Sequence, residues 1–303
     1  MSSADIDAGT GGTTAENRPP PHRARRKRLS FGRIVGYMAL TLVALVSLIP
    51  FLWMLSTSLK SLAETYVLPP RWIPGTFRFD NYTTLWNDFP MNFWLFNSAK
   101  VAVLVTLGTL VTCSMAAYAF ARIEFPGRDL LFYAFIGTMM IPGMMYQVPK
   151  FALVRELGWY DHPSHAALIV PALSSAFGVF LLRQFFLTIP KELEEAARID
   201  GAGHWTIFVQ IILPLSGPAL ATLGVFTFIG VWNDFLNPLL FYDELNLYTL
   251  QTGLGFLNDA HSSTVNVNRK MAGDVIALIP MIVVFMAAQK YYVRGIALTG
   301  TKA

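Results

Sequence analysis

The chain has 303 residues, of which 54% are hydrophobic and only 14% are charged. Soluble domains carry about 25% charged residues, so the composition excludes an ordinary soluble protein and indicates a membrane protein. The net charge of +4 does not indicate nucleic-acid binding, because much of the excess lies between Arg23 and Arg28, beside the first apolar run. Charge in that position sets membrane topology.

Residues 1–32 are rich in Ser, Gly, Thr, Ala and Pro and end in the basic cluster. This composition predicts a disordered basic tail on the cytoplasmic side. A cleaved signal peptide is the competing interpretation. However, the apolar run that follows is about 22 residues long, beyond the 7–15 residues of a signal sequence.

The rest of the chain is predicted to be all-α, because only helices and closed barrels satisfy their own backbone in lipid. A bilayer core of about 30 Å needs about 20 helical residues. Six windows qualify, at 34–56, 100–121, 130–149, 165–187, 216–241 and 273–293. Pro142 and Gly143 predict a kink in the third window. The predicted division is a first transmembrane helix with its outer loop at 33–96, a core of five helices at 97–293, and a cytoplasmic tail at 294–303.

The distribution of Lys and Arg predicts the orientation. With the N-terminus inside, 15 of the 23 basic residues fall on the inner side and about 8 on the outer side. Both termini are therefore expected in the cytoplasm. The outer loops are then 57–99, 150–164 and 242–272, and the inner loops are 122–129 and 188–215.

The inner loop at 188–215 is the most informative segment. Pro190 can open a helix, and the acidic residues that follow suit the positive end of the helix dipole. Gly201 can end this helix in a left-handed conformation. A second short helix is predicted from about His204 to Leu213, with Pro214 closing it.

The alanines of this loop offer two interpretations. Ala196 and Ala197 have almost no side chain, so a partner surface could approach the backbone closely, with Glu195 and Arg198 beside it as polar contacts. Alternatively, the loop is a solvated connector between two membrane helices.

The spacing Glu195-Ala196-Ala197, three residues, Gly201, nine residues, Ile211, one residue, Leu213-Pro214 resembles the EAA loop of ABC importer permeases. Three further segments resemble the sugar-importer branch, specifically the smaller permease of the maltose type. They are Ile199 to Ala202, Trp232 to Phe235, and Gln289 to Gly295 followed by Gly300-Thr301-Lys302. The resemblance covers about residues 35–303.

The resemblance implies the fold of a type I ABC importer permease with six transmembrane helices. It also implies that the loop acts as a coupling helix seated in a groove of a separate cytoplasmic ATPase. The residues it assigns to ATPase coupling are Glu195, Ala196, Ala197, Arg198, Asp200, Gly201, Leu213 and Pro214. The chain has no Gly-Lys dipeptide and hence no P-loop, so we expect no catalytic residue and no cofactor, with ATP bound by the partner subunit.

The partners that the resemblance implies are a second homologous permease, an ATPase dimer, and an extracytoplasmic sugar-binding protein or lipoprotein, all within membrane lipid. In such permeases the outer loop at 242–272 touches the binding protein or the other permease, and the tail at Gly300-Thr301-Lys302 reaches between the ATPases. Similar permeases carry maltodextrins, disaccharides, N-acetylglucosamine and its oligomers, or glycerol phosphate.

The fifth predicted helix carries a polar face. Helical spacing places five residues on one side: Thr227, Gly230, Asn233, Asp234 and Asn237. An Asp at the bilayer centre costs about 2.5–3.5 kcal/mol, so it is expected to face protein or water. Either Gly230, Asn233, Asp234 and Asn237 line a substrate path, or Asn233 and Asp234 brace a bend at Pro238 or bond a neighbouring helix.

Other chemistry is poorly supported. The five histidines are scattered, His162 and His165 fall in an outer loop, and no HExxH or GxSxG motif is present; we expect no metal site. A secondary transporter driven by an ion gradient is the main alternative, because such carriers use paired intramembrane charges. Only Asp234 qualifies, without an evident basic partner. A scaffold or signalling subunit is the third possibility.

Overall fold

The computed structural model describes residues 31–259 and 267–299, and every regular element within them is a helix. The all-α prediction is therefore correct. The chain divides into two compact units, 1–49 and 50–303, and each is considered by itself. Most of the predicted tail at 1–32 and the predicted ATPase-contacting segment Gly300-Thr301-Lys302 lie outside the described residues.

The first unit contains most of α1 (Phe31–Ser58), and the boundary between the units falls within this helix, just before Pro50. Residues Val35–Ser58 have a mean hydropathy of 2.3 over their most apolar window and number 24. At about 1.5 Å per residue they rise about 36 Å, enough to cross a bilayer core of about 30 Å. The first predicted window is confirmed.

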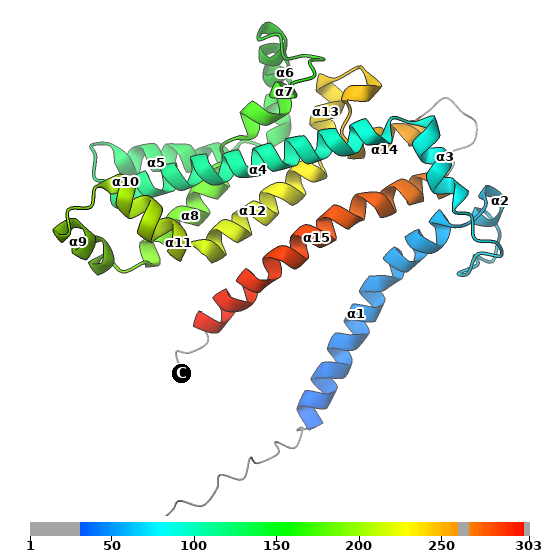
Figure 1. The fold of residues 1–303 in the computed structure, drawn as a ribbon, viewed down its shortest axis with the longest axis horizontal. Coiled ribbons are helices and arrows are strands. Elements are labelled where there is room, and N and C mark those ends of the chain that lie inside the picture. Colours follow the sequence, from blue (N-terminus) through cyan, green and yellow to red (C-terminus); the bar gives the residue numbers. More distant parts are fainter. Residues whose placement is uncertain (1–30, 260–266, 300–303) are drawn as a thin grey trace, which may run out of the picture. The chain divides into compact units, whose positions relative to one another are not determined.

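The second unit is built around α4 (Met91–Arg122), which packs against both α8 (Ala176–Thr188) and α12 (Gly217–Trp232) (Figure 1). Small residues allow the close approach of α4 and α8. A Cβ atom on Gly178 would lie 2.9 Å from the Sγ atom of Cys113, which is fully buried. Cys113 is therefore a packing residue.

The third predicted window is a bent pair of helices rather than one kinked helix. α5 (Arg128–Gly137) and α6 (Gln147–Glu156) belong to segments that meet at 93°, with the break at Pro142. Two 3₁₀ turns connect them, η1 (Thr138–Met140) and η2 (Gly143–Tyr146). The predicted start of the outer loop at residue 150 is wrong, because α6 continues through Lys150 to Glu156.

The fifth predicted window, 216–241, is also interrupted. α12 ends at Trp232, and α13 (Leu236–Phe241) follows after a break. The cause is local: Asp234 Oδ1 accepts a hydrogen bond from the backbone N–H of Asn237, at 3.2 Å. Short polar side chains that bond to nearby backbone compete with the helix ladder in this way.

The fourth and sixth windows are confirmed with altered ends. α7 (Ala166–Ile169) and the 3₁₀ turn η3 (Val170–Ala172) precede α8, and together Ala166–Thr188 could span a membrane. α15 (Val267–Thr299) packs against α12 and is longer than predicted, so part of the expected tail at 294–303 is helical.

By length and composition, four helices of the described chain could cross a membrane. The four segments are Val35–Ser58, Met91–Arg122, Ala166–Thr188 and Val267–Gln289. Two bent pairs, Arg128–Met140 with Gly143–Glu156 and His204–Leu215 with Gly217–Trp232, raise the number to as many as six.

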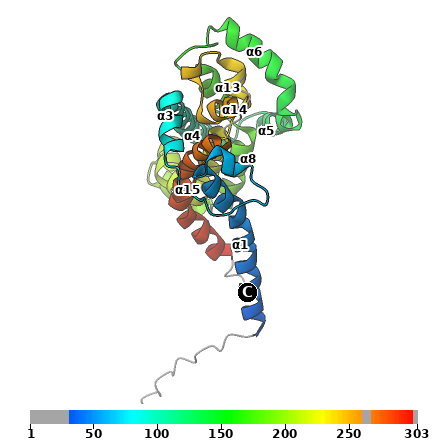
Figure 2. The same ribbon diagram turned by 90° about the vertical axis from the view of Figure 1, so that its right-hand side faces the viewer.

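At one end of the second unit, α6 lies beside α13 in both views (Figure 1, Figure 2). The 3₁₀ turn η5 (Leu245–Leu247) and α14 (Leu250–Asp259) contact α4 there. The apolar core around Trp94 and Phe241 holds these elements together. We call this the α6 end.

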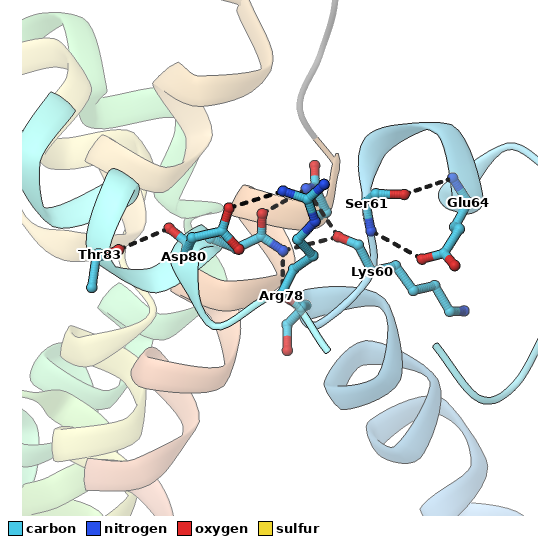
Figure 3. A network of polar contacts seen from close by, with 9 residues as sticks. Lys60, Ser61, Glu64, Arg78, Asp80 and Thr83 are labelled. Carbon is cyan, nitrogen blue, oxygen red and sulfur yellow. Dashed lines mark hydrogen bonds and ion pairs between the residues drawn. The ribbon is translucent and has the colours of Figure 1, made fainter. Parts of the chain in front are cut away.

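The chain between α1 and α4 is held by polar contacts. Ser61 and Glu64 cap α2 (Leu62–Thr65) reciprocally (Figure 3). Asn81 of α3 (Asp80–Asp88) donates to the carbonyl oxygens of Ser58, at 2.8 Å, and Lys60, at 2.9 Å. These bonds fix α3 against the end of α1.

Asn268 extends this network to α15. Its side-chain amide donates to the Oδ1 atom of Asn81, at 2.9 Å, and to the carbonyl oxygen of Lys60, at 3.2 Å. The start of α15 is thereby tied to α3 and to the end of α1.

A second apolar core lies at the opposite end, which we call the α9 end. It is formed by α4, α8, the segment 189–213 and the first turns of α12, and its largest members include Phe186, Ile207 and Ile212. This core seats the predicted loop on the ends of two long helices.

Candidate functional site

The predicted loop contains α9 (Glu192–Ile199), whose ends follow helix electrostatics. Acidic residues occupy its first turn and Arg198 its last, which matches the helix dipole. Gly201 has φ +84°, and its N–H donates to the carbonyl oxygen of Arg198. The N–H of Ala202 donates to the carbonyl oxygen of Ala197. This is a Schellman motif, so the predicted stop at Gly201 is confirmed.

The second short helix differs from the prediction. α10 (His204–Ile207) passes into a π-helical turn, η4 (Phe208–Ile212), and then into α11 (Leu213–Leu215). Pro214 does not close the segment, because it lies in the first turn of α11, where its missing N–H needs no partner. The segment instead turns at Ser216 and meets α12 at 77°.

The residues that resemblance assigned to ATPase coupling lie mostly on the surface. Glu195, Ala196, Arg198, Asp200, Gly201 and Pro214 are exposed, and Ala197 and Leu213 are half-buried. Ala197 and Leu213 pack against the core at the α9 end. The exposed part of α9 is therefore free to contact another molecule. Ala196 belongs to this exposed part, and Ala197 lies between it and the core.

Sequence reasoning missed Glu194, the one buried residue of α9. Its Oε1 atom lies 2.8 Å from the Nε atom of Arg122, the last residue of α4, and both side chains are about 95% buried, at 5% and 3% exposure. Arg122 also donates through Nη2 to the carbonyl oxygens of Phe186 and Ile189, both at 2.6 Å. The sequence feature that could have indicated this pair is Arg122 itself, a charged residue at the end of an apolar span.

His204 makes a second connection between α4 and the loop. Its Nδ1 atom lies 3.4 Å from the hydroxyl of Tyr118, and the Tyr118 ring packs on Phe208 with 5.1 Å between centroids. A cavity of about 440 Å³ opens between these elements and the start of α5. Its lining includes His204 and seven charged residues: Arg122, Glu124, Arg128, Lys191, Glu194, Glu195 and Arg198.

The predicted substrate-path residues divide into two groups at the α6 end. Asp234 and Asn237 are half-buried and bonded to each other, with Asn237 Nδ2 donating to Asp234 Oδ2 at 2.8 Å. Lys150 of α6 donates to Asn237 Oδ1 at 2.9 Å. The expectation that Asp234 has no evident basic partner overlooked Lys150, which reaches Asp234 through Asn237. It failed because Lys150 was assigned to a loop.

Gly230 and Asn233 remain exposed. Asn233 is the C-cap of α12 and accepts a hydrogen bond from Gln251 Nε2, at 3.3 Å. A Cβ atom added to Gly230 would meet nothing within 4 Å. The continuous polar face that was predicted through Asn237 is broken where the helix ends.

The cavity beside Asp234, Asn237 and Lys150 is about 50 Å³. A water molecule needs about 10–15 Å³ by this measure, so the cavity admits a few waters and no sugar ring. Within residues 31–259 and 267–299, no group of three or more His, Cys, Asp or Glu side chains is placed to hold a metal ion.

Comparison with known proteins decides the family. Residues 24–298 match the model of the family described as binding-protein-dependent transport system inner membrane component. The chain belongs to this family. It is therefore a membrane permease subunit of an ABC transporter.

Individual relatives agree. The chain is similar to the diacetylchitobiose uptake system permease protein NgcG of Streptomyces coelicolor, at 30% identity over 84% of each chain. It is 35% identical to the sn-glycerol-3-phosphate transport system permease protein UgpE of Yersinia enterocolitica, over 77% of this chain and 84% of that one.

A solved structure shows the same fold. It is that of a bacterial ABC transporter involved in the import of the acidic polysaccharide alginate. One of its chains matches this permease with a TM-score of 0.76 at 26% identity, over 86% of this chain and 95% of that chain. These findings support an ABC permease and do not support an ion-driven secondary carrier.

Proposed function

We propose that this permease is one of two membrane subunits of an ATP-driven importer for a sugar or oligosaccharide. The relatives named for diacetylchitobiose and alginate transport support a carbohydrate substrate. The implied partners are a second homologous permease, a cytoplasmic ATPase dimer and an extracytoplasmic binding protein. The family's own description as binding-protein-dependent supports the last of these.

The exposed face of α9 is the observation that carries the ATPase-coupling part of the proposal. Glu195, Ala196 and Arg198 are open to solvent on a short helix whose opposite side is anchored in the core at the α9 end. A rigid, small-residue surface suits docking, because the partner backbone can approach closely. Segment 190–214 is then the coupling loop, and the ATPase supplies the nucleotide site.

The proposed orientation places the α9 end and both termini in the cytoplasm. The excess of Lys and Arg on that side supports it. The proposed division is then the first transmembrane helix with its outer loop at 33–96 and the core at 97–293, with the tails 1–32 and 294–303 inside.

We further propose that Gly230 and Asn233 border the substrate path, since both are exposed near the α6 end. Asp234 and Asn237 brace the break between α12 and α13 and support this border. Gly230→Phe is expected to lower uptake while ATPase association persists. Unchanged uptake in that variant would remove this residue from the path.

The main test is charge reversal on the exposed face of α9. Glu195→Lys is expected to weaken co-purification of the ATPase with the permease and to abolish uptake, while membrane insertion is retained. Glu156→Lys is the matched control, because Glu156 is an exposed helical residue at the end of α6. ATPase association that survives Glu195→Lys and also Ala196→Trp would refute docking at α9.

A further inference from the structure

Arg122 contacts three elements at once. It ends α4, its Nε atom lies 2.8 Å from Glu194 of α9, and its Nη2 atom donates to two carbonyl oxygens at the end of α8 and just beyond it. A guanidinium presents several donors in a rigid plane, so one side chain can hold both partners in a fixed geometry. Lysine has a single nitrogen and cannot reproduce this.

The pair is the main polar attachment of α9 to the rest of the protein. Glu194 is the only residue of α9 with a buried side chain. Elsewhere in the loop, His204 makes a longer polar contact with Tyr118, at 3.4 Å, and the remaining contacts with the core are mostly apolar. Arg198 adds a looser contact, with its Nη2 atom 3.9 Å from Glu194 Oε2 and nearly half of its side chain exposed. A displacement of α9 must therefore act on Arg122.

Because Arg122 is the last residue of α4, a displacement of α9 can be transmitted to α4. α4 is a 32-residue helix that packs against α8 and α12, so a pull at its last residue acts on the whole core. An ion pair with about 95% burial is little screened by solvent, and the charge-assisted hydrogen bonds of Arg122 Nη2 to the carbonyl oxygens of Phe186 and Ile189 add direction. The contact between α9 and α4 therefore has a more fixed geometry than an apolar contact would have.

We propose that the Arg122–Glu194 pair is the mechanical link that converts movement of α9 into movement of α4 and α8. The two residues are positioning residues for transport and do not themselves contact the ATPase. This inference rests on the proposed docking of the ATPase at α9, and it assigns docking to Glu195 and transmission to its neighbour.

The test separates transmission from docking by measuring two quantities in proteoliposomes with the ATPase and binding protein present. One is ATPase association, and the other is ATP hydrolysed per substrate imported. Glu194→Gln and Arg122→Lys are expected to leave association intact. They should raise the ATP cost per substrate by about tenfold or more, because loss of one partner of a buried ion pair costs at least the free energy that corresponds to that factor.

Glu124→Gln is the matched control, since Glu124 is exposed two residues beyond Arg122 and undergoes the same chemical change. It is expected to leave both quantities unchanged. An unchanged ATP cost in Glu194→Gln would overturn the proposal, and so would loss of ATPase association in that variant. Failure of the docking proposal is distinguished separately, by intact association in both Glu195→Lys and Ala196→Trp.

A single substitution that leaves one charge buried can prevent folding. The double variant Arg122→Met with Glu194→Met avoids this, because it keeps buried volume and leaves no lone charge. We expect it to fold, bind the ATPase and hydrolyse ATP with little import. Import coupled as in the unaltered protein would overturn the link.

Discussion

Replacing Gly201 with alanine is expected to loosen the end of α9 without any steric contact. Gly201 has φ +84°, and a Cβ atom added there would meet nothing within 4 Å. The cost is therefore the backbone strain of a left-handed alanine, about 1–2 kcal/mol. That energy corresponds to a factor of about 5–30 in the population of the opened state.

Hydrogen–deuterium exchange measures this opening directly. The amides of Gly201 and Ala202 close the Schellman motif, and they are expected to exchange about 5–30 times faster in Gly201→Ala. Uptake should fall in parallel, because a frayed α9 presents its docking surface less of the time. Gly201→Asn should be milder, since asparagine tolerates the left-handed region.

Gly203 provides a control with the same chemical change. It lies two residues away at φ −77°, and an added Cβ atom would also meet nothing within 4 Å. Gly203→Ala is expected to leave exchange and uptake unchanged. If Gly201→Ala and Gly203→Ala behave alike, or if Gly201→Asn is as damaging as alanine, the backbone argument is wrong.

Gly253→Ala should destabilise the folded protein by about 1–3 kcal/mol, because its methyl group would lie 2.3 Å from the indole of Trp94; an unchanged thermal unfolding midpoint in detergent would contradict this. Gly178→Ala should cost less, since its closest neighbour is a sulfur atom of α4 at 2.9 Å, and a larger loss than in Gly253→Ala would refute the ranking. Lys150→Met and Asp234→Asn should each lower stability, and the double variant should lose less than the sum by about 0.5–3 kcal/mol. Strictly additive losses would show that these two charges do not interact.

The sequence predicted the membrane helices because apolar length alone determines which segments can cross a bilayer. It placed a kink at Pro142 but gave neither its 93° bend nor the break at Asn233. Hydropathy averages over a window, and a break of three residues barely changes the average. The break after Trp232 depends on Asp234 bonding the amide of Asn237, a local competition that periodicity does not register.

Lys150 was misplaced for a related reason. A charged residue normally marks the end of an apolar window, so the segment from 150 was assigned to a loop. The structure instead continues the helix to Glu156 and directs the ammonium group at Asn237. A partner supplied by another helix 87 residues away cannot be read from local composition.

The coupling loop shows where single-sequence reasoning stops. The stop at Gly201 could be predicted, because the left-handed residue is specified by glycine itself. The difference between Glu194 and Glu195 could not. Both are acidic residues in the first turn of one helix, and both suit its dipole equally.

Adjacent residues on a helix point about 100° apart, so burial of one carboxylate exposes the next. Which of the two is buried depends on where α4 ends, and α4 ends 72 residues before Glu194 with Arg122 as its last residue. The carboxylate of Glu195 is thereby exposed to solvent, and the carboxylate of Glu194 is buried in the protein. Charge removal at the two positions should therefore impair transport in different ways. At position 195 it should weaken association with the ATPase, and at position 194 it should raise the amount of ATP hydrolysed per substrate imported.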